Sequence, residues 1–221
     1  RISHDIDGGS SMGAFYFGTE SSADFNRVAG GDLHLNFRQT KDVYAFFLKS
    51  ASPGVSGRDW AGRAAFSAIE NGYTANVSYT NIQANYRNDL GFVPRSDAAL
   101  VDWEYERNLR PRKTYRWVRT YTVGGEGQFF LNGGHDRLMS RVTRHDYSAE
   151  FADGGRLGLD LDWNYERLTE PFEITRGVMV PAGEYRFAQA IPSYSSDRSR
   201  WLSGNLRMTL GQFWDGGITG I

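Results

Sequence analysis

Hydrophobic and polar residues alternate along much of this chain with a period of two. Between Arg156 and Glu166, every odd position carries a leucine or an aromatic residue, and every even position carries a polar residue or glycine. A β-strand places such residues on opposite faces, whereas a helix would scatter them around its axis. The segment is therefore predicted to be a strand with one apolar and one polar face.

The same alternation predicts an all-β protein built as an antiparallel meander. Val101, Trp103 and Tyr105 alternate with acidic residues, and Leu33, Leu35 and Phe37 alternate with polar ones. In Asp42–Ala51, by contrast, both faces are apolar. We expect eleven strands, near residues 11–20, 31–39, 42–51, 59–70, 73–82, 97–107, 115–131, 139–151, 155–167, 184–196 and 200–213.

The predicted connections alternate in length. Short ones, rich in turn-forming residues, fall at 39–41, 71–72, 152–154 and 197–199. Longer ones fall between them, at 21–30, 52–58, 83–96 and 168–183. Outer-membrane β-barrels show this asymmetry, with short periplasmic turns and longer extracellular loops.

Strand length favours a membrane barrel over a soluble sandwich. The predicted strands cluster around 9–13 residues, whereas globular strands average about 5–6 and a tilted membrane strand needs about 9–11. In a barrel, the apolar face contacts lipid and the polar face lines the lumen. The lipid-facing and aromatic-girdle candidates are Trp103, Tyr105, Leu157, Leu159, Leu161, Trp163 and Tyr165. The lumen-facing candidates are Asp102, Glu104, Glu106, Asp160, Asp162 and Glu166.

A short internal repeat supports the girdle interpretation. Asp102–Arg107 and Asp162–Arg167 share five of six residues, and a proline follows each four positions later. Because the two strands are three apart in the meander, they run in opposite directions. We therefore expect their Trp and Tyr residues at opposite rims, as in an aromatic girdle.

Composition narrows the function classes. The 221 residues carry a formal net charge of −1, with 26 glycines, 14% aromatic residues and no cysteine. The near-neutral charge argues against a nucleic-acid partner. Without cysteine, neither a disulfide nor a thiolate metal site can form. No stretch approaches the roughly 18 apolar residues of a transmembrane helix.

Three patterns could suggest catalysis or metal binding, and each has a simpler interpretation. Gly9–Gly13 matches G-x-S-x-G, but it precedes a strand rather than a helix. Histidine–aspartate pairs at His4, His135 and His145 lack the convergence that a metal site needs. Asp160 and Asp162 could lie about 7 Å apart on one strand face, a spacing that glycoside hydrolysis permits. We predict no catalytic residue, metal or cofactor.

Several motifs between residues 85 and 216 together carry a family resemblance. They are Asn88–Asp97, Asn108–Arg112, Glu170–Ile174, Val180–Phe187 and Gly211–Gly216. In that order, they resemble the C-terminal region of a large, functionally uncharacterised bacterial family. Its members carry an N-terminal module similar to family-9 carbohydrate-binding domains, followed by a long β-barrel region.

The resemblance implies that residues 1–221 form a single barrel domain, an internal or C-terminal piece of a longer outer-membrane protein. The expected partners are outer-membrane lipid and, in the full-length chain, the carbohydrate-binding module. The expected role is a pore wall, a transporter wall or a membrane anchor. Two alternatives remain open: a soluble β-sandwich that binds carbohydrate, and part of a carbohydrate-active hydrolase.

Overall fold

The computed structural model describes residues 1–93, 95–111 and 117–221, and it confirms an all-β antiparallel meander. These ranges contain sixteen strands and one turn of 3-10 helix, η1 (Asp7–Gly9). The strands are β1 (Ile2–Ile6), β2 (Ser10–Glu20), β3 (Phe25–Phe37), β4 (Lys41–Ala51), β5 (Trp60–Glu70), β6 (Tyr73–Ile82), β7 (Ala98–Leu109), β8 (Val118–Asn132), β9 (Leu138–Phe151), β10 (Arg156–Leu168), β11 (Phe172–Thr175), β12 (Val178–Val180), β13 (Gly183–Ser195), β14 (Asn205–Arg207), β15 (Thr209–Phe213) and β16 (Gly216–Gly220).

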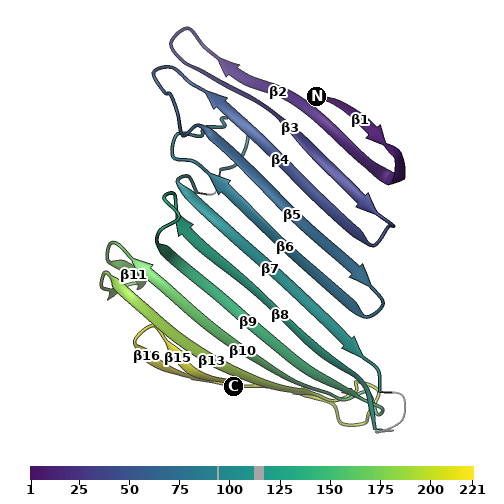
Figure 1. Ribbon diagram of the computed structural model, residues 1–221. Helices are drawn as coiled ribbons and strands as arrows, with labels where there is room; N and C mark the ends of the chain where they lie inside the picture. The colour runs from purple at the N-terminus through teal and green to yellow at the C-terminus, as the bar shows by residue number, and fades with distance from the viewer. Residues whose placement is uncertain (94, 112–116) are drawn as a thin grey trace. The chain divides into compact units, whose positions relative to one another are not determined.

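The chain divides into two compact units. The first comprises residues 1–70, 75–103 and 130–138, and the second comprises residues 71–74, 104–129 and 139–221. Strands β1 to β5 of the first unit pair in chain order, as Figure 1 shows in purple and blue. In the second unit, β9, β10, β13, β15 and β16 follow one another, and β14 also pairs with β13.

Most of the strand predictions hold, and the exceptions have local causes. The expected long connection at 21–30 is wrong, because β3 already begins at Phe25. A tight turn replaces it, in which the amide of Asp24 donates to Ser21 Oγ and the amide of Ser21 donates to the Asp24 carbonyl. The predicted strand 200–213 is broken into β14 and β15 at Met208. Of the predicted strand 115–131, residues 115 and 116 lie outside the described residues.

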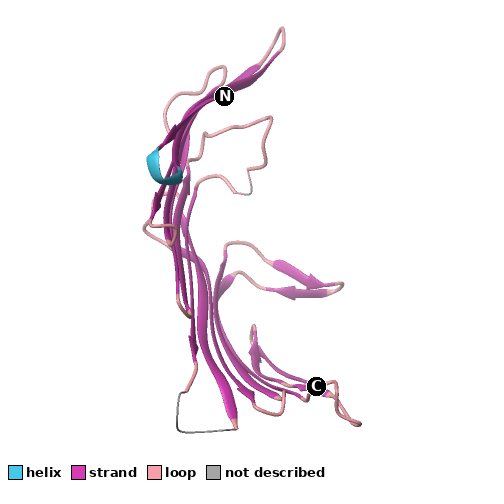
Figure 2. Cartoon of the chain, turned by 90° about the vertical axis from the view of Figure 1, so that its right-hand side faces the viewer, coloured by secondary structure: helices cyan, strands magenta, loops and turns pink. Residues whose placement is uncertain are grey.

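The short strands were not predicted, because they are too brief to show a period. They are β1, β11 and β12, each of three to five residues. The β11–β12 hairpin forms a separate two-stranded sheet within the connection from β10 to β13. Figure 2 shows it standing out from the other strands of its unit, and marks η1 in cyan.

The buried core of the first unit is small and one-sided. Val28, Ala61 and Tyr86 form it, and Phe17, Leu48, Ile82 and Val93 pack against it. Tyr86 and Val93 come from the connection 83–97 between β6 and β7, so that this segment folds back over the strands. No helix in the described part of the chain is long and apolar enough to cross a membrane.

Candidate functional site: two opposed strand faces

The first unit presents a continuous apolar face on β2 to β5. Strand register fixes its membership, because paired residues share a face and alternate residues do not. Between the levels of Lys49 and Lys41 on β4, this face carries no charged residue, and apart from Ser10 at the start of β2 its residues are apolar or glycine. They are Met12, Ala14, Tyr16, Ala29, Gly31, Leu33, Leu35, Phe37, Val43, Ala45, Phe47, Trp60, Gly62, Ala64, Phe66 and Ala68.

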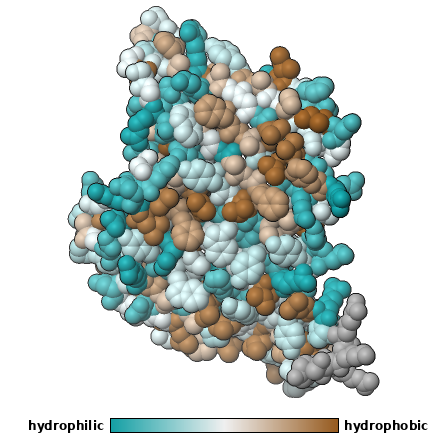
Figure 3. Space-filling model, viewed as in Figure 1, coloured by the Kyte–Doolittle hydropathy of each residue, from teal (hydrophilic) through white to brown (hydrophobic). Residues whose placement is uncertain are grey.

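This apolar face is exposed rather than packed. Phe47 is 53% exposed and Tyr16 is 63% exposed, and Phe37 is likewise exposed. Lys41 and Lys49 are eight residues apart, which corresponds to about 26 Å of strand at ~3.3 Å per residue. Figure 3 shows brown and pale surface over the middle of the strands, with deep teal surface gathered toward their ends.

The opposite face of the same strands carries polar pairs. Arg1 NH2 lies 3.0 Å from Asp32 Oδ2, and His34 Nε2 lies 2.7 Å from Asp42 Oδ1. Arg63 donates to Thr80 Oγ1 at 3.1 Å. The lumen candidate Asp102 belongs to this face, where Ser78 Oγ donates to it and Arg63 lies 3.9 Å away.

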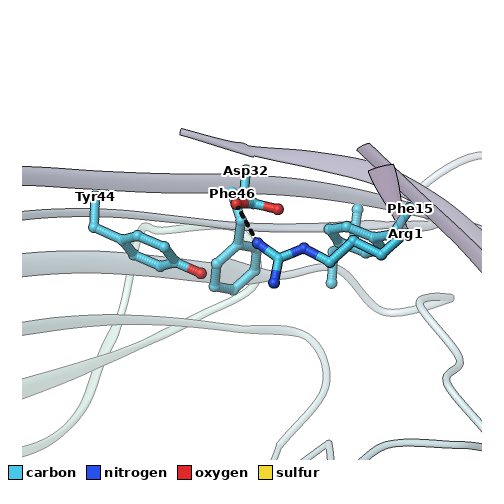
Figure 4. A pocket seen from close by; sticks show the side chains of 6 residues that line it. Arg1, Phe15, Asp32, Tyr44 and Phe46 are labelled. Atoms are coloured by element: carbon cyan, nitrogen blue, oxygen red, sulfur yellow. Dashed lines mark hydrogen bonds and ion pairs between the residues drawn. The ribbon is translucent and has the colours of Figure 1, made fainter. Parts of the chain in front are cut away.

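Aromatic residues interrupt this polar face and explain why Asp42–Ala51 looked apolar on both sides. Tyr44, Phe46 and Leu48 share the polar face with Asp32, and together with Phe15 and Arg1 they line an open hollow. Figure 4 shows the Arg1 guanidinium reaching Asp32 between the rings of Phe15 and Phe46. The connection 83–97 covers the neighbouring part of this face around Val28.

The connection 83–97 is anchored through Asn26, of which 2% is exposed. The Asn26 amide donates to the Arg87 carbonyl at 3.0 Å and to Ser52 Oγ at 3.3 Å, and its oxygen accepts from the Asp89 amide at 3.0 Å. Arg87 also lies 2.7 Å from Asp24 and 2.6 Å from Asp89. The hydrogen bond from Arg87 lowers the pKa of Asp24, whereas burial raises the pKa of Tyr86.

The second unit repeats the division into two faces. Leu157, Leu159, Leu161, Trp163 and Tyr165 lie on one face of β10, as expected. Leu157 is 51% exposed and Trp163 is 40% exposed, whereas Asp162 on the opposite face is 8% exposed. On β10, apolar side chains are thus exposed while a carboxylate on the opposite face is buried.

Tyr165 departs from its predicted exposure, since it is 5% exposed. Register places Arg141 of β9 and Arg186 of β13 on either side of it. The Arg186 guanidinium lies 5.7 Å from the centroid of the Tyr165 ring. Tyr165 therefore lies on the predicted face but beneath basic side chains.

Arginine pairs with most of the predicted lumen acids of β10. Arg144 Nε lies 2.7 Å from Asp162 Oδ1, and Arg144 NH1 lies 3.7 Å from Glu126. Arg207 NH2 lies 3.2 Å from Asp160 Oδ2. Glu166 is half-buried on the same face. The two aspartates are thus each held by a different guanidinium, so the geometry does not single them out as a catalytic pair.

The acids of β7 are more open. Glu104 and Glu106 are exposed, and Asn108 Nδ2 donates to Glu106 Oε1 at 2.6 Å. Thr122 Oγ1 of β8 donates to Asn108 Oδ1 at 2.7 Å. The side chains of Thr122, Asn108 and Glu106 therefore lie on one face of β7 and β8. Trp103 is half-buried in the first unit.

The expectation that the repeated aromatics mark opposite rims is wrong. The Tyr105 hydroxyl lies 3.1 Å from His145 Nδ1, and the His145 and Trp163 rings lie 5.7 Å apart. Tyr105 and Trp163 are each the eighth residue of their strand, near its middle. Opposite strand directions therefore do not separate them, and they form one row across the face.

Aromatic residues nevertheless lie toward both ends of the apolar face in the second unit. Trp117 stacks on Phe151 with ring centroids 5.5 Å apart, at the end where β9 meets β10. Tyr165 lies toward the other end, two residues beyond Trp163 on β10. Phe151 and Arg141 are ten residues apart on β9, about 33 Å of strand, or roughly 25 Å across a layer if the strand is tilted by about 40°.

Three of the family-like motifs meet in one aromatic cluster. Trp214 lies 6.2 Å from Phe172, 5.1 Å from Tyr185 and 5.8 Å from Phe187, measured between ring centroids. These residues belong to the segments 170–174, 180–187 and 211–216. The cluster fastens the β11–β12 hairpin to β13 and β15. Pro94 and Arg112 of the remaining motifs lie outside the described residues.

The patterns that could suggest chemistry do not assemble. Ser10 and Ser11 open β2, and Ser10 Oγ accepts from the Asn36 amide at 3.0 Å, so that G-x-S-x-G is not a strand-to-helix turn. His135 contacts Asn81 in a turn, while His145 lies in the aromatic row. Among the described residues, no group of three or more potential ligands could hold a metal ion.

Comparisons of this chain with protein-family models, curated proteins and solved structures found no match.

Proposed function

We propose that this chain forms a wall of a bacterial outer-membrane β-barrel, acting as a pore wall, a transporter wall or a membrane anchor. The lipid of the outer membrane is its proposed partner at the apolar face. The proposed role includes no catalytic activity of this chain.

The observation that carries this proposal is the exposed, charge-free face of β2 to β5. Transfer of such a face into water is unfavourable by about 25 cal/mol per Å² of apolar surface. Soluble monomers seldom expose a contiguous apolar patch of more than a few hundred Å². A face four strands wide that is bounded by Lys41 and Lys49 suits a hydrocarbon layer.

The opposite face supports the same proposal. Its arginines and carboxylates pair with one another, as in Arg144–Asp162 and Arg207–Asp160. Such pairs lie close to water in a lumen, where long charged side chains remain solvated and ions can pass. The hydrogen-bonded meander also satisfies backbone groups between strands, as a bilayer requires.

We further propose that the chain belongs to the bacterial family that its motifs resemble. The convergence of Phe172, Tyr185 and Trp214 supports this assignment, because one physical cluster explains why separate motifs occur together. Any carbohydrate-binding activity of the full-length protein would then reside in the N-terminal module.

Carbohydrate binding by this chain itself is the second candidate, and the hollow beside Asp32 favours it. Phe15, Tyr44 and Phe46 offer ring faces there, and Asp32 and Arg1 offer polar groups. Pockets that combine apolar walls with a few polar groups suit small ligands. A soluble monomer that binds oligosaccharide without detergent would support this candidate.

Detergent partition combined with heat-modifiable migration tests the main proposal. We expect the folded chain to enter the detergent phase and to migrate faster in gel electrophoresis before boiling than after it. A chain that is folded, monomeric and soluble without detergent would overturn the proposal.

A further inference from the structure

Three arginines gather at one end of the apolar face of the second unit. Arg141 of β9 and Arg186 of β13 flank Tyr165 in register, and Arg167 follows Tyr165 by two residues on the same face of β10. Glu184 is paired opposite Arg167. Three positive charges and one negative charge leave the group with a formal charge of +2.

Only part of this group is satisfied by protein contacts. Arg167 Nε donates to the Tyr165 hydroxyl at 3.2 Å, and Arg167 NH2 lies 2.8 Å from Glu184 Oε1. Arg186 stacks over Tyr165. Within the described ranges, neither Arg141 nor Arg186 has an ion-pair partner, and Arg141 Nε is buried without an acceptor.

An unpaired buried guanidinium N–H is costly, since its lost hydration is not replaced. The contrast with the polar face is direct, because Arg144 and Arg207 are both matched to carboxylates there. Guanidinium groups bind phosphate oxygens well, because their planar donors can form two parallel hydrogen bonds. The group therefore matches a phosphate in charge and in donors.

The position of the group indicates where that phosphate comes from. Leu157, Leu159, Leu161 and Trp163 precede Tyr165 and Arg167 on one face of β10. On β13, Ala190 and Ala188 precede Arg186 in the same direction. Apolar residues thus give way to an aromatic residue and then to arginine, the order found where hydrocarbon meets headgroups.

The lengths of the connections indicate at which end of the strands the arginines lie. Within the second unit, β10 and β13 are joined at this end by the connection 169–182, whereas β9 and β10 are joined at the other end by 152–155. Longer connections mark the extracellular side of an outer-membrane barrel. The arginines accordingly face the headgroups of the outer leaflet.

We propose that Arg141 and Arg186 bind the phosphate of a membrane lipid headgroup at this edge, with Arg167 and Tyr165 holding them in place. This inference rests on the proposed membrane location and adds a lipid class to it. Each basic side chain near a membrane surface strengthens binding to anionic headgroups by a similar factor, so the factors for two arginines multiply.

Native mass spectrometry of the chain in lipid nanodiscs tests this inference. The probes are phosphatidic acid, which exposes a phosphate monoester, and phosphatidylcholine, which does not. We expect the unaltered chain to retain phosphatidic acid preferentially. The double variant R141Q/R186Q should lose this preference by about thirtyfold, the change expected for two surface charges.

The matched control is R156Q/R207Q, which removes two arginines from the polar face of the neighbouring strands β10 and β14. It should keep its lipid preference within about twofold, and a loss equal to that of R141Q/R186Q would overturn the inference. Displacement of the bound lipid by millimolar inorganic phosphate would also overturn it, because the site would then bind the free ion. A chain that inserts but shows no preference refutes this inference alone, whereas a chain that does not insert refutes the proposed function.

Discussion

Asn26 connects two segments that are far apart in the sequence. Its amide side chain contacts the Arg87 carbonyl, Ser52 Oγ and the Asp89 amide while 2% of the residue is exposed. Sequence inspection missed it, because asparagine is common in turns and the residue fell within a predicted loop. Its location before the apolar Val28 is a weak signal that cannot reveal a partner sixty residues later.

The variant Asn26→Ala should release the connection 83–97. Removing the side chain leaves buried backbone groups without partners, a loss of about 2 kcal/mol. Limited trypsin digestion detects the release of the connection, and we expect faster cleavage after Arg87 and Arg95 in this variant. Asn85→Ala is the control, since Asn85 is exposed and donates one hydrogen bond to Gly57. Equal cleavage in both variants would contradict the anchoring role.

The anchor should also weaken in acid. Arg87 lowers the pKa of Asp24 below its ordinary value, so the ionised form is favoured in the folded state. The stabilisation is fully present above the unfolded pKa of about 3.9, and it is lost as the pH falls through the lower folded value. Hydrogen-exchange protection factors in segment 83–97, taken relative to the intrinsic exchange rate at each pH, should fall in that range, and they should fall less in Asp24→Asn. Protection factors that do not change with acidification would contradict the prediction.

At the scale of strands, the apolar and polar faces should tolerate charge differently. Ala190 and Gln189 are neighbours on β13 that lie on the apolar and the polar face, respectively. Ala190→Arg should destabilise the chain in a bilayer by roughly 2–4 kcal/mol, the cost of arginine near the midplane. Gln189→Arg, which points to the side of Asp162, should cost less than about 1 kcal/mol. Urea unfolding from vesicles measures both, and equal losses would contradict two distinct faces.

The ion pair between Arg144 and Asp162 should behave as one unit. Arg144→Gln leaves the 8%-exposed Asp162 without its guanidinium partner, whereas the double variant R144Q/D162N removes both charges. We expect the double variant to be more stable than the single one, with a coupling of about 1–3 kcal/mol. Strictly additive losses in the double-mutant cycle would show that the two residues do not interact.

Strands with clear alternation could be predicted from the sequence, and strands without it could not. The segments 73–82 and 155–167 match β6 and β10 within a residue, because one face of each is continuously apolar or aromatic. The start of β3 was missed, since Asn26 and Arg27 resemble a turn and their strand pairing with β2 depends on a distant register. Short β11 and β12 depend on the aromatic cluster around Trp214 rather than on their own period.

The candidate site shows the same limit at the level of contacts. Alternation alone placed Leu157, Leu159 and Trp163 on one face and Asp160 and Asp162 on the other, in agreement with the structure. It could not identify Arg144 and Arg207 as the partners of those acids. The sequence pattern also predicted that Tyr105 and Trp163 lie at opposite rims. It gives the direction of each strand, but not how far one strand is shifted along its neighbours.

For the whole molecule, the proposed function requires that the apolar face of the meander contacts lipid. The composition does not decide which face contacts lipid, because a soluble sheet with the same residues would bury the face that is exposed here. Exposure of Phe47 and Leu157 opposite ion-paired polar groups favours lipid contact. A direct measurement must therefore report the environment of individual side chains in a bilayer.

Single-cysteine labelling along β10 provides that measurement, because the chain has no native cysteine to interfere. Each position from 157 to 164 would carry one environment-sensitive fluorophore, read in vesicles with a lipid-soluble and a water-soluble quencher. A lipid-facing apolar face predicts quenching by the lipid-soluble quencher at 157, 159, 161 and 163, and quenching by the water-soluble quencher at 158, 160, 162 and 164. The reverse assignment of the two quenchers, or equal access of the water-soluble quencher to all eight positions, would contradict it.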